Sequence, residues 1–300
     1  MGWRATDIPD QSGRLAVVTG ANSGIGLETA RELARKGARV AMACRSETKA
    51  RAAQAVIMEE IPDARIDLWP LDLSSLESIR SFAKAFHEKH ETLDLLINNA
   101  GVMIPPFGRT ADGFEIQFGT NHLGHFALTA QLIDLLLPTA GSRVVTVSSI
   151  AHRFGRIRFD NLNAERGYSA SLAYAQSKLA NLSFALELHR RLEERGQKTL
   201  SVAAHPGWTA TNLQDNSAFA RFFSKHLAQS ATRGALPTLR AATAPNAQGG
   251  HYYGPRGWFE MQGSPIVAYT TRRARDPATA KTLWTVSEEL TGVRFAVDVD

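Results

Sequence analysis

The stretch of sequence that decides the fold is TGANSGIG, residues 19–26, which joins two segments of opposite character. Before it stands RLAVVTG (14–20), a short apolar run with the β-branched residues of a buried strand. After it come GLETARELARKGA (26–38), whose apolar residues recur at helical spacing, and a second apolar run, ARVAMAC (38–44). Strand, helix and strand in this order predict a βαβ unit, and hence a parallel sheet with right-handed crossovers.

The glycines of this turn favour a nucleotide-binding role. Without Cβ atoms the chain can turn tightly and approach a pyrophosphate, and the next helix directs its free N–H groups and positive dipole end at that anion. We therefore expect a dinucleotide site on the turn. The expected contacts are Gly20, Asn22, Ser23, Gly24, Ile25 and Gly26.

Composition fits one packed globule that works on small molecules. Hydrophobic residues make up 44% of the 300 residues and charged residues 21%. No apolar run approaches the roughly 18 residues of a membrane helix, and MGWRATDIPD (1–10) lacks the apolar core of a signal peptide. We therefore expect a cytoplasmic protein without a membrane span. The lone cysteine, Cys44, excludes an internal disulfide and a cysteine-rich metal site, and no metal is expected.

The positive charge does not indicate a nucleic-acid-binding protein. The net charge is +5, but Lys and Arg are scattered, and the densest cluster, TTRRARD (270–276), has no stacking aromatic residues around it. Scattered charge of this kind is ordinary solvated surface, and an anionic small ligand would account for part of the excess.

Further strands and helices follow the first unit. RIDLWPLDL (65–73), LDLLINNAG (93–101), SRVVTVSS (142–149) and TLSVAAHPG (199–207) read as buried strands. Ser74 and Glu77 have the spacing of a capping box that opens the next helix. The segment FEIQFGTNHLGHFALTAQLIDLLL (114–137) reads as an apolar helix with Asn121 in its interior, where asparagine competes for backbone hydrogen bonds.

These motifs together resemble the classical short-chain dehydrogenases/reductases. The resemblance rests on Thr-Gly-x-x-x-Gly-x-Gly at 19–26, Asn-Asn-Ala-Gly at 98–101, the serine pair at 148–149, Tyr-x-x-x-Lys at 174–178 and Pro-Gly at 206–207. It implies an α/β fold, a Rossmann-type doubly wound parallel sheet in a single NAD(P)-binding domain over residues 1–300. The 25 residues from Ser149 to Tyr174 and the tail YYGPRGWFEMQGSP (252–265) resemble the retinol-dehydrogenase-like and WW-domain-oxidoreductase-like branch, of which this chain looks like a bacterial-type member.

The resemblance also assigns site residues. Asp72 would touch adenine, Asn99 and its neighbours would line the adenosine side, and the segment after Pro206 would hold the carboxamide and the pyrophosphate. Ser149, the second serine of its pair, would be catalytic, and Asn121 would hold a water in a proton relay. The further cofactor contacts implied are Asp72, Leu73, Asn99, Ala100, Gly101, Tyr174, Lys178, Pro206, Gly207, Thr209 and Thr211.

The residue after the second strand indicates which cofactor is preferred. An acidic residue there would bond the ribose 2′-hydroxyl of NAD, whereas this chain has Arg45, which can pair with the 2′-phosphate of NADP. NADP(H) is therefore the expected cofactor. NAD(H) stays possible, because the glycine turn lacks the extra basic residue of many NADP-dependent relatives.

LAYAQSKLAN (172–181) carries the expected chemistry. In a helix Tyr174 and Lys178 lie one turn apart on the same face. The alternative is a packing aromatic beside a snorkelling cation. A nearby ammonium would stabilise the phenolate and lower the tyrosine pKa. Tyr174 would then be the acid or base, Ser149 would hold the oxyanion, and Lys178 would orient the ribose and pass protons toward Asn121. Tyr168 is a weaker rival acid, because Leu172 occupies its i+4 position.

Three segments would surround the substrate. The insertion between Ser149 and Tyr174 could form a flap, and because such an insertion can block a helix-to-helix dimer, a homo-oligomer stays open. NLQDNSAFARFFSKHLAQ (212–229) carries aromatic residues at helical spacing, and we expect either a core-facing helix or a substrate lid over about 208–230. Trp258 and Phe259 would wall the apolar pocket from a substrate-side extension over about 250–300.

The sequence thus predicts an NADP(H)-preferring oxidoreductase that acts on a carbonyl or alcohol of a lipophilic molecule, an aldehyde, a ketone or an alcohol. A non-catalytic dinucleotide-binding redox sensor is the alternative. Such a sensor typically loses the tyrosine or the lysine, and this chain keeps both.

Overall fold

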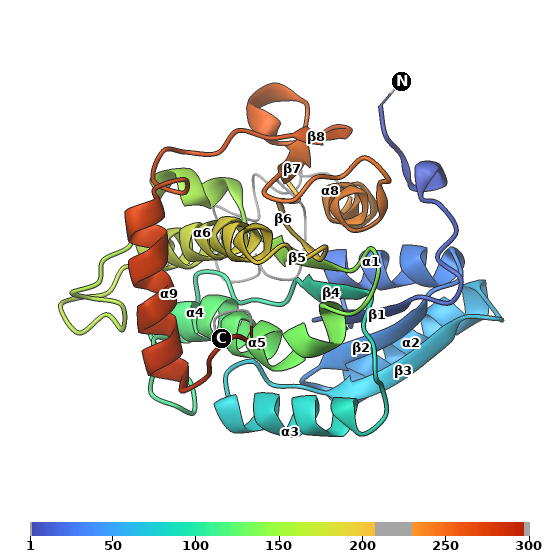
Figure 1. Ribbon diagram of the computed structural model, residues 1–300, viewed down its shortest axis with the longest axis horizontal. Coiled ribbons are helices and arrows are strands. Elements are labelled where there is room, and N and C mark those ends of the chain that lie inside the picture. The colour runs from blue at the N-terminus through green and yellow to red at the C-terminus, as the bar shows by residue number, and fades with distance from the viewer. Residues whose placement is uncertain (1, 208–229, 297–300) are drawn as a thin grey trace.

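The computed structural model describes residues 2–207 and 230–296, and within them eight strands form one sheet (Figure 1). The strand order is β3-β2-β1-β4-β5-β6-β7-β8, parallel from β3 to β7, with β8 antiparallel to β7. The strands are β1 (Leu15–Thr19), β2 (Arg39–Cys44), β3 (Arg65–Pro70), β4 (Leu95–Asn98), β5 (Arg143–Val147), β6 (Leu200–Ala204), β7 (Tyr252–Pro255) and β8 (Pro265–Val267).

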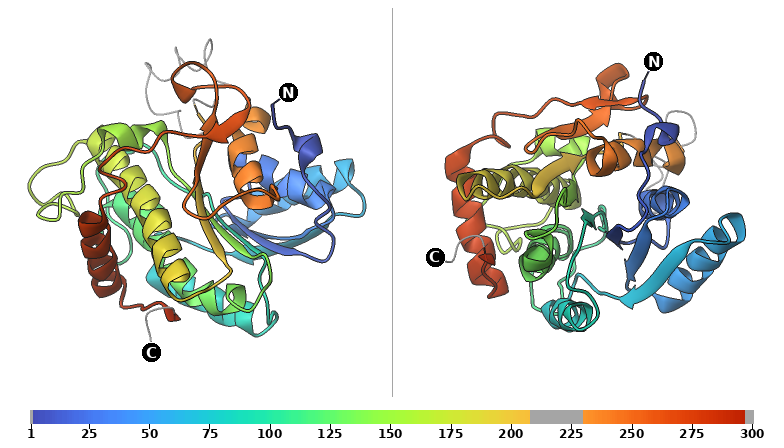
Figure 2. Two further views of the ribbon diagram at one scale, coloured as in Figure 1. Left: turned by 45° about the horizontal axis from the view of Figure 1, so that its top comes forward. Right: turned by 45° about the vertical axis from the view of Figure 1, so that its right-hand side comes forward.

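Helices cover both faces of the sheet (Figures 1 and 2). Val17 of β1 packs in a core with α3, α5, α6 and α9, whereas its neighbour Val18 packs in a core with α1, α2 and α8. Successive strand residues face opposite sides, so each buried strand serves both cores. The helices are α1 (Gly24–Arg35), α2 (Glu47–Glu60), α3 (Leu76–His87), α4 (Ile116–Phe118), α5 (Gly124–Leu136), α6 (Ala170–Glu194), α8 (Ala231–Thr243) and α9 (Pro277–Thr291).

This architecture confirms the predicted Rossmann-type sheet. The six strands predicted up to residue 207 all form. The antiparallel edge strand β8 departs from the purely parallel expectation, and neither β7 nor β8 was predicted. Both are short and contain a proline, and neither has an alternating apolar pattern that would mark a strand. Among the described residues no helix is both long and apolar enough to cross a membrane.

The capping box predicted at Ser74 and Glu77 is wrong. The helix α3 is capped one residue later, by Ser75, whose Oγ accepts a hydrogen bond from the N–H of Ser78 at 3.2 Å. Ser74 instead donates its N–H and hydroxyl to Asp72, at 2.9 and 2.6 Å. That turn fixes the carboxylate at the end of β3.

The long helix predicted over 114–137 is interrupted. A π-helical turn, η2 (Gly119–Leu123), separates α4 from α5 and contains Asn121. Single π-turns inside α-helices occur frequently at functional sites. The asparagine inside the predicted helix therefore did mark the place where the helix is irregular.

Candidate active site

The glycine turn lies at the carboxyl end of β1, where the strand order reverses between β1 and β4, the point at which such sheets bind ligands. Gly20 has φ of 66°, and a Cβ on Gly26 would lie 2.4 Å from the carbonyl oxygen of Gly20. Only glycine allows this approach of helix to turn. Ser23 is the N-cap of α1 but makes no side-chain capping bond, so its side chain leaves the N–H groups of the first turn to an incoming anion.

A cavity of about 460 Å³ runs from this turn toward α6. Most of the cofactor residues predicted from sequence line it together. They are Gly20, Asn22, Ser23, Gly24, Ile25, Gly26, Arg45, Asp72, Leu73, Asn99, Ala100, Gly101, Tyr174, Lys178 and Pro206.

Some predicted residues lie elsewhere. Asn121, Ser149 and Gly207 do not line the cavity, although each lies beside a residue that does. Thr209, Thr211 and nearly all of the predicted lid over 208–230 lie outside the described residues, as does the side chain of Trp258.

Lys49 lines the cavity and was missed from sequence. Ser46 caps α2 by accepting the N–H of Lys49 at 3.4 Å, and Arg45 immediately precedes that cap. Two cationic side chains therefore line the cavity at the end where β2 stops and α2 begins. The sequence feature that could have indicated Lys49 is its place, as a basic residue, in the first turn of the helix after the second strand.

Thr19 links the glycine turn to the Asn-Asn-Ala-Gly segment. Its hydroxyl accepts the N–H groups of Asn99 and Ala100, both at 2.9 Å, and its carbonyl accepts the side-chain amide of Asn99 at 2.8 Å. Asn98 donates to Thr129 of α5 at 2.8 Å. These bonds tie the carboxyl end of β4 to β1 and to α5.

The amide of Asn121 is fully engaged with protein groups. Its Oδ1 accepts the N–H of Val102 at 2.8 Å, and its Nδ2 donates to the carbonyl of Val102 at 2.9 Å and to the hydroxyl of Ser177 at 3.0 Å. Both amide hydrogens are used, so the Asn121 side chain has none left to donate to a water. A relay water at this residue would bind its backbone carbonyl instead.

Tyr174, Lys178 and Ser149 lie together near the N-terminal end of α6. The Nζ of Lys178 is 5.8 Å from the centroid of the Tyr174 ring and donates to the carbonyl of Val147 at 3.2 Å. Ser149 forms a side-chain hydrogen bond with Tyr174, whereas Ser148 donates to the carbonyl of Lys178 at 2.6 Å. Of the two serines, only Ser149 thus reaches the phenol.

Burial sets the protonation of the pair. It raises the pKa of Tyr174 to about 12, against a smaller lowering by the Ser149 hydrogen bond, and it lowers the pKa of Lys178 to about 8. The Tyr174 pKa is therefore raised in the protein alone, where the sequence predicted a lowering, because desolvation of the phenolate outweighs the Ser149 hydrogen bond. The phenol stays protonated at neutral pH.

A group of charged and polar side chains around the half-buried Glu260 ties three segments together beside the site. Glu260 meets the guanidinium of Arg153 at 2.5 Å and the Nε2 of His205 at 3.2 Å, and it accepts the N–H of Tyr269 at 3.0 Å. Arg153 lies in η3 (Ile150–Phe154), which begins directly after Ser149, and His205 accepts the N–H of Gly207 at 3.2 Å. The tail of the chain is thereby fixed to the segments around Ser149 and Pro206.

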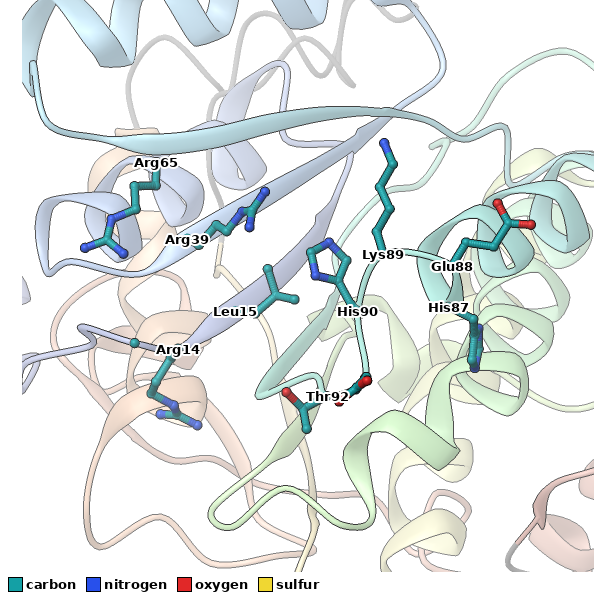
Figure 3. Close-up of a pocket in the computed structure, with 11 residues that line it drawn as sticks. Arg14, Leu15, Arg39, Arg65, His87, Glu88, Lys89, His90 and Thr92 are labelled. Atoms are coloured by element: carbon teal, nitrogen blue, oxygen red, sulfur yellow. The ribbon is translucent and has the colours of Figure 1, made fainter.

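A second hollow, of about 550 Å³, lies at the opposite edge of the sheet, at the amino ends of β1, β2 and β3 (Figure 3). Its Arg39 pairs with Asp67 at 2.6 Å and its Arg14 pairs with Asp94 at 3.3 Å. None of the site residues predicted from the sequence lines this hollow. Among the residues that the structure describes, no group of three or more His, Cys, Asp or Glu is placed to hold a metal ion.

Comparisons with known proteins agree with this geometry. The family model described as short chain dehydrogenase matches residues 14–220. Human retinol dehydrogenase 12 is 44% identical over 291 residues, which cover 94% of this chain and 88% of that protein. A crystal structure of an uncharacterized protein from Mycobacterium paratuberculosis has a TM-score of 0.84 at 44% identity, over 98% of this chain and 99% of that one. A Pseudomonas aeruginosa complex with NADP has a TM-score of 0.63 at 24% identity, over 81% and 94% of the chains, a likeness of fold alone.

Proposed function

The chain belongs to the short-chain dehydrogenase family, and on that premise we propose that it prefers NADP(H) and that it acts on a carbonyl or alcohol group of a lipophilic small molecule. As a member of this family it is an NAD(P)-dependent oxidoreductase. The bound cofactor supplies the hydride that reduces a carbonyl carbon, or accepts one from an alcohol. The observation that carries the proposal is the cluster of Ser149, Tyr174 and Lys178 at the end of a cavity that begins at the glycine turn.

We assign the proton of carbonyl reduction to Tyr174. A phenol with a pKa of about 12 stays protonated at neutral pH and can donate to an oxygen that gains charge. Ser149, hydrogen-bonded to the same phenol, is placed to donate to that oxygen and stabilise it. Lys178 supplies a positive charge beside the tyrosinate that forms, which favours the transfer.

Reprotonation of Tyr174 is assigned to Lys178 and Asn121. The Nζ of Lys178 and the Oδ1 of Asn121 both lie beside the α-carbon of Gly101, since a Cβ built there would lie 3.6 and 2.9 Å from them. A side chain at position 101 would intrude between the two. Both amide hydrogens of Asn121 are already bound, and we assign its backbone carbonyl as the acceptor in a water-mediated relay.

The preference for NADP(H) rests on Arg45 and Lys49. Both line the cavity at the end of β2, where the adenosine ribose lies in proteins of this fold. Asp72 is the one acidic residue among the described residues that line the cavity, and its carboxylate accepts hydrogen bonds from Ser74. Two cations favour a 2′-phosphate over a 2′-hydroxyl. NAD(H) remains a possible, weaker cofactor.

The lipophilic substrate is supported by the surface around the site. Phe154 is the last residue of η3, the short helix that follows Ser149, and its side chain is 75% exposed. The side chains of Phe259 and Tyr269 in the tail are 64% and 59% exposed. Aromatic side chains offer a large apolar contact area to a ligand. The relative named retinol dehydrogenase 12 points to the same class. We propose a single domain over residues 1–300, with a lid at about 208–230 and a substrate-side extension at about 250–300.

Turnover of a carbonyl panel tests the proposal. The purified protein is mixed with NADPH or NADH and a series of apolar aldehydes and ketones, and absorbance at the reduced-nicotinamide band is followed. Faster turnover with NADPH supports the proposal. Tight NADPH binding without turnover of any panel member would favour the redox sensor. Cytoplasmic location and a homo-oligomer stay predictions, checked by cell fractionation and light scattering.

A further inference from the structure

His125 lies in the first turn of α5, fully buried, and both of its ring nitrogens have partners. Nδ1 is 2.9 Å from the backbone carbonyl of Asn121, and Nε2 is 2.9 Å from the hydroxyl of Thr19. One imidazole therefore touches both the π-turn and the strand that leads into the glycine turn. None of the roles assigned so far uses this residue.

The hydrogen bonds fix the tautomer of His125. A carbonyl oxygen can only accept, so Nδ1 must carry the hydrogen that it donates to Asn121. Burial, with a smaller contribution from the charge of Lys178, lowers the pKa of His125 to about 4, so the ring is neutral near pH 7 and Nε2 is an acceptor.

Thr19 completes the pattern. Its hydroxyl hydrogen has two acceptors in reach, His125 Nε2 at 2.9 Å and the carbonyl of Ile97 at 3.2 Å, and the shorter bond goes to the imidazole. The hydroxyl oxygen meanwhile accepts the N–H groups of Asn99 and Ala100. A continuous chain of hydrogen bonds thus runs from the cofactor-lining residues Asn99 and Ala100 through Thr19 and His125 to the carbonyl of Asn121.

The end of this chain is the atom assigned to the relay. Both amide hydrogens of Asn121 are bound by Val102 and Ser177, and the relay proposed above uses the backbone carbonyl as the acceptor of the water's hydrogen. That oxygen has two lone pairs, and His125 takes one of them. The remaining lone pair points in a direction that the imidazole helps to set.

We propose that His125 is a positioning residue, which as the Nδ1–H tautomer orients the Asn121 carbonyl and couples it to the glycine turn through Thr19. The inference rests on the proposed function, because it assumes that Asn121 and Lys178 return the proton to Tyr174. His125 touches neither cofactor nor substrate and acts only through Asn121.

Two substitutions separate the two ring nitrogens. His125→Asn places an amide N–H where Nδ1 lies and keeps the donor to Asn121, whereas His125→Gln places its amide near Nε2 and loses that donor. We expect kcat of His125→Gln to fall about tenfold or more, the size of effect that follows loss of one buried hydrogen bond. We expect kcat of His125→Asn to stay within about threefold of the parent, as far as that same bond is retained.

Readouts beyond turnover distinguish positioning from packing. Thermal melting and the Kd for NADPH, from quenching of tryptophan fluorescence, are measured for both variants. A packing role would lower the melting temperature and kcat of both variants alike, and equal impairment would overturn the proposal, as would a Gln variant with the parental kcat.

An NMR measurement on the unmutated chain tests the tautomer without turnover. Nitrogen shifts of ¹⁵N-labelled histidine at pH 7 should include the signals of a neutral ring with its hydrogen on Nδ1 that are absent from His125→Asn, and this assigns them to His125. A ring at position 125 that is protonated, or hydrogenated on Nε2, overturns the inference even in a chain that reduces no carbonyl. Failure of the proposed function shows instead as no turnover by the parent protein.

Discussion

The ammonium of Lys178 and the phenol ring of Tyr174 lie one helical turn apart on α6, with Nζ 5.8 Å from the ring centroid. The two side chains face one cavity, and burial moves their pKa values in opposite directions, to about 12 for the phenol and about 8 for the ammonium. A protonated phenol and a protonated ammonium then coexist at neutral pH. That pairing gives the reaction a defined dependence on pH.

Carbonyl reduction should lose activity above about pH 8. Lys178 loses its proton as the pH rises through its pKa of about 8, whereas Tyr174 keeps its own until about 12. We expect kcat to be flat at lower pH and to fall on the alkaline side around pH 8. The profile is measured with saturating NADPH. A kcat that is flat to pH 10 would show that the charge of Lys178 has no part in the reaction.

Cofactor choice should depend on Arg45 more than on Lys49. Arg45→Asp should lower kcat/KM for NADPH by about 10- to 100-fold, as expected for loss of a hydrogen bond to a charged group, and should leave NADH turnover unchanged or faster. Lys49→Ala should have a smaller effect of the same sign. Arg51→Ala is the matched control, because Arg51 lies on the same helix but pairs with Glu47 and does not line the cavity. Equal losses for NADPH and NADH in Arg45→Asp would contradict the assignment.

The glycine turn should not tolerate a methyl group at position 26. In Gly26→Ala the new Cβ would lie 2.4 Å from the Gly20 carbonyl, so the helix must move away from the turn. We expect NADPH binding to weaken at least tenfold, about 1.4 kcal/mol, in a fluorescence titration. In Gly108→Ala the nearest atom is 3.9 Å from the new Cβ, and NADPH binding should be unchanged.

Acid should unfold the protein through its buried histidines. Burial lowers the pKa of His122 to about 3 and of His125 and His152 to about 4. The unfolded chain binds these protons near pH 6.5, so the free energy of unfolding should fall as the pH drops from about 6.5 toward 4. The melting temperature is compared at pH 7.5 and 5.

Replacing one buried histidine tests whether these histidines cause the loss of stability in acid. His122→Gln should show a smaller loss of melting temperature between these pH values, because one titrating group is gone. His87→Gln should not, since hydrogen bonding to Ala83 and Asp134 outweighs burial and raises the pKa of His87. If the melting temperature falls equally between pH 7.5 and 5 in the parent protein, His122→Gln and His87→Gln, groups other than His122 cause the loss of stability.

Local sequence patterns predicted the sheet and most of the site because both follow from short-range chemistry. The glycine turn, the strand ends and the Tyr-x-x-x-Lys spacing place their residues through backbone geometry alone, and the cavity brings them together as expected. The last two strands, β7 and β8, had no such pattern, since tertiary pairing selects them. The pKa of Tyr174 was mispredicted because desolvation depends on the whole fold rather than on the neighbouring cation.

His125 and Lys49 show what a sequence leaves open. His125 reads as one more polar residue in an apolar helix, and its role depends on a contact with Thr19, 106 positions away. Lys49 reads as an ordinary helix residue until the cap at Ser46 places it beside Arg45. Long-range contacts of this kind become visible only in the folded chain.

The most direct test of the central claim is kcat for NADPH-dependent carbonyl reduction by Tyr174→Phe, measured together with its Kd for NADPH. Loss of a general acid should lower kcat by about 100-fold or more, while the Kd changes little, because the ring is kept and only the hydroxyl is removed. A variant that binds NADPH like the parent and still reduces the carbonyl at the parental rate would contradict the assignment of Tyr174 as the acid, and with it this account of the site.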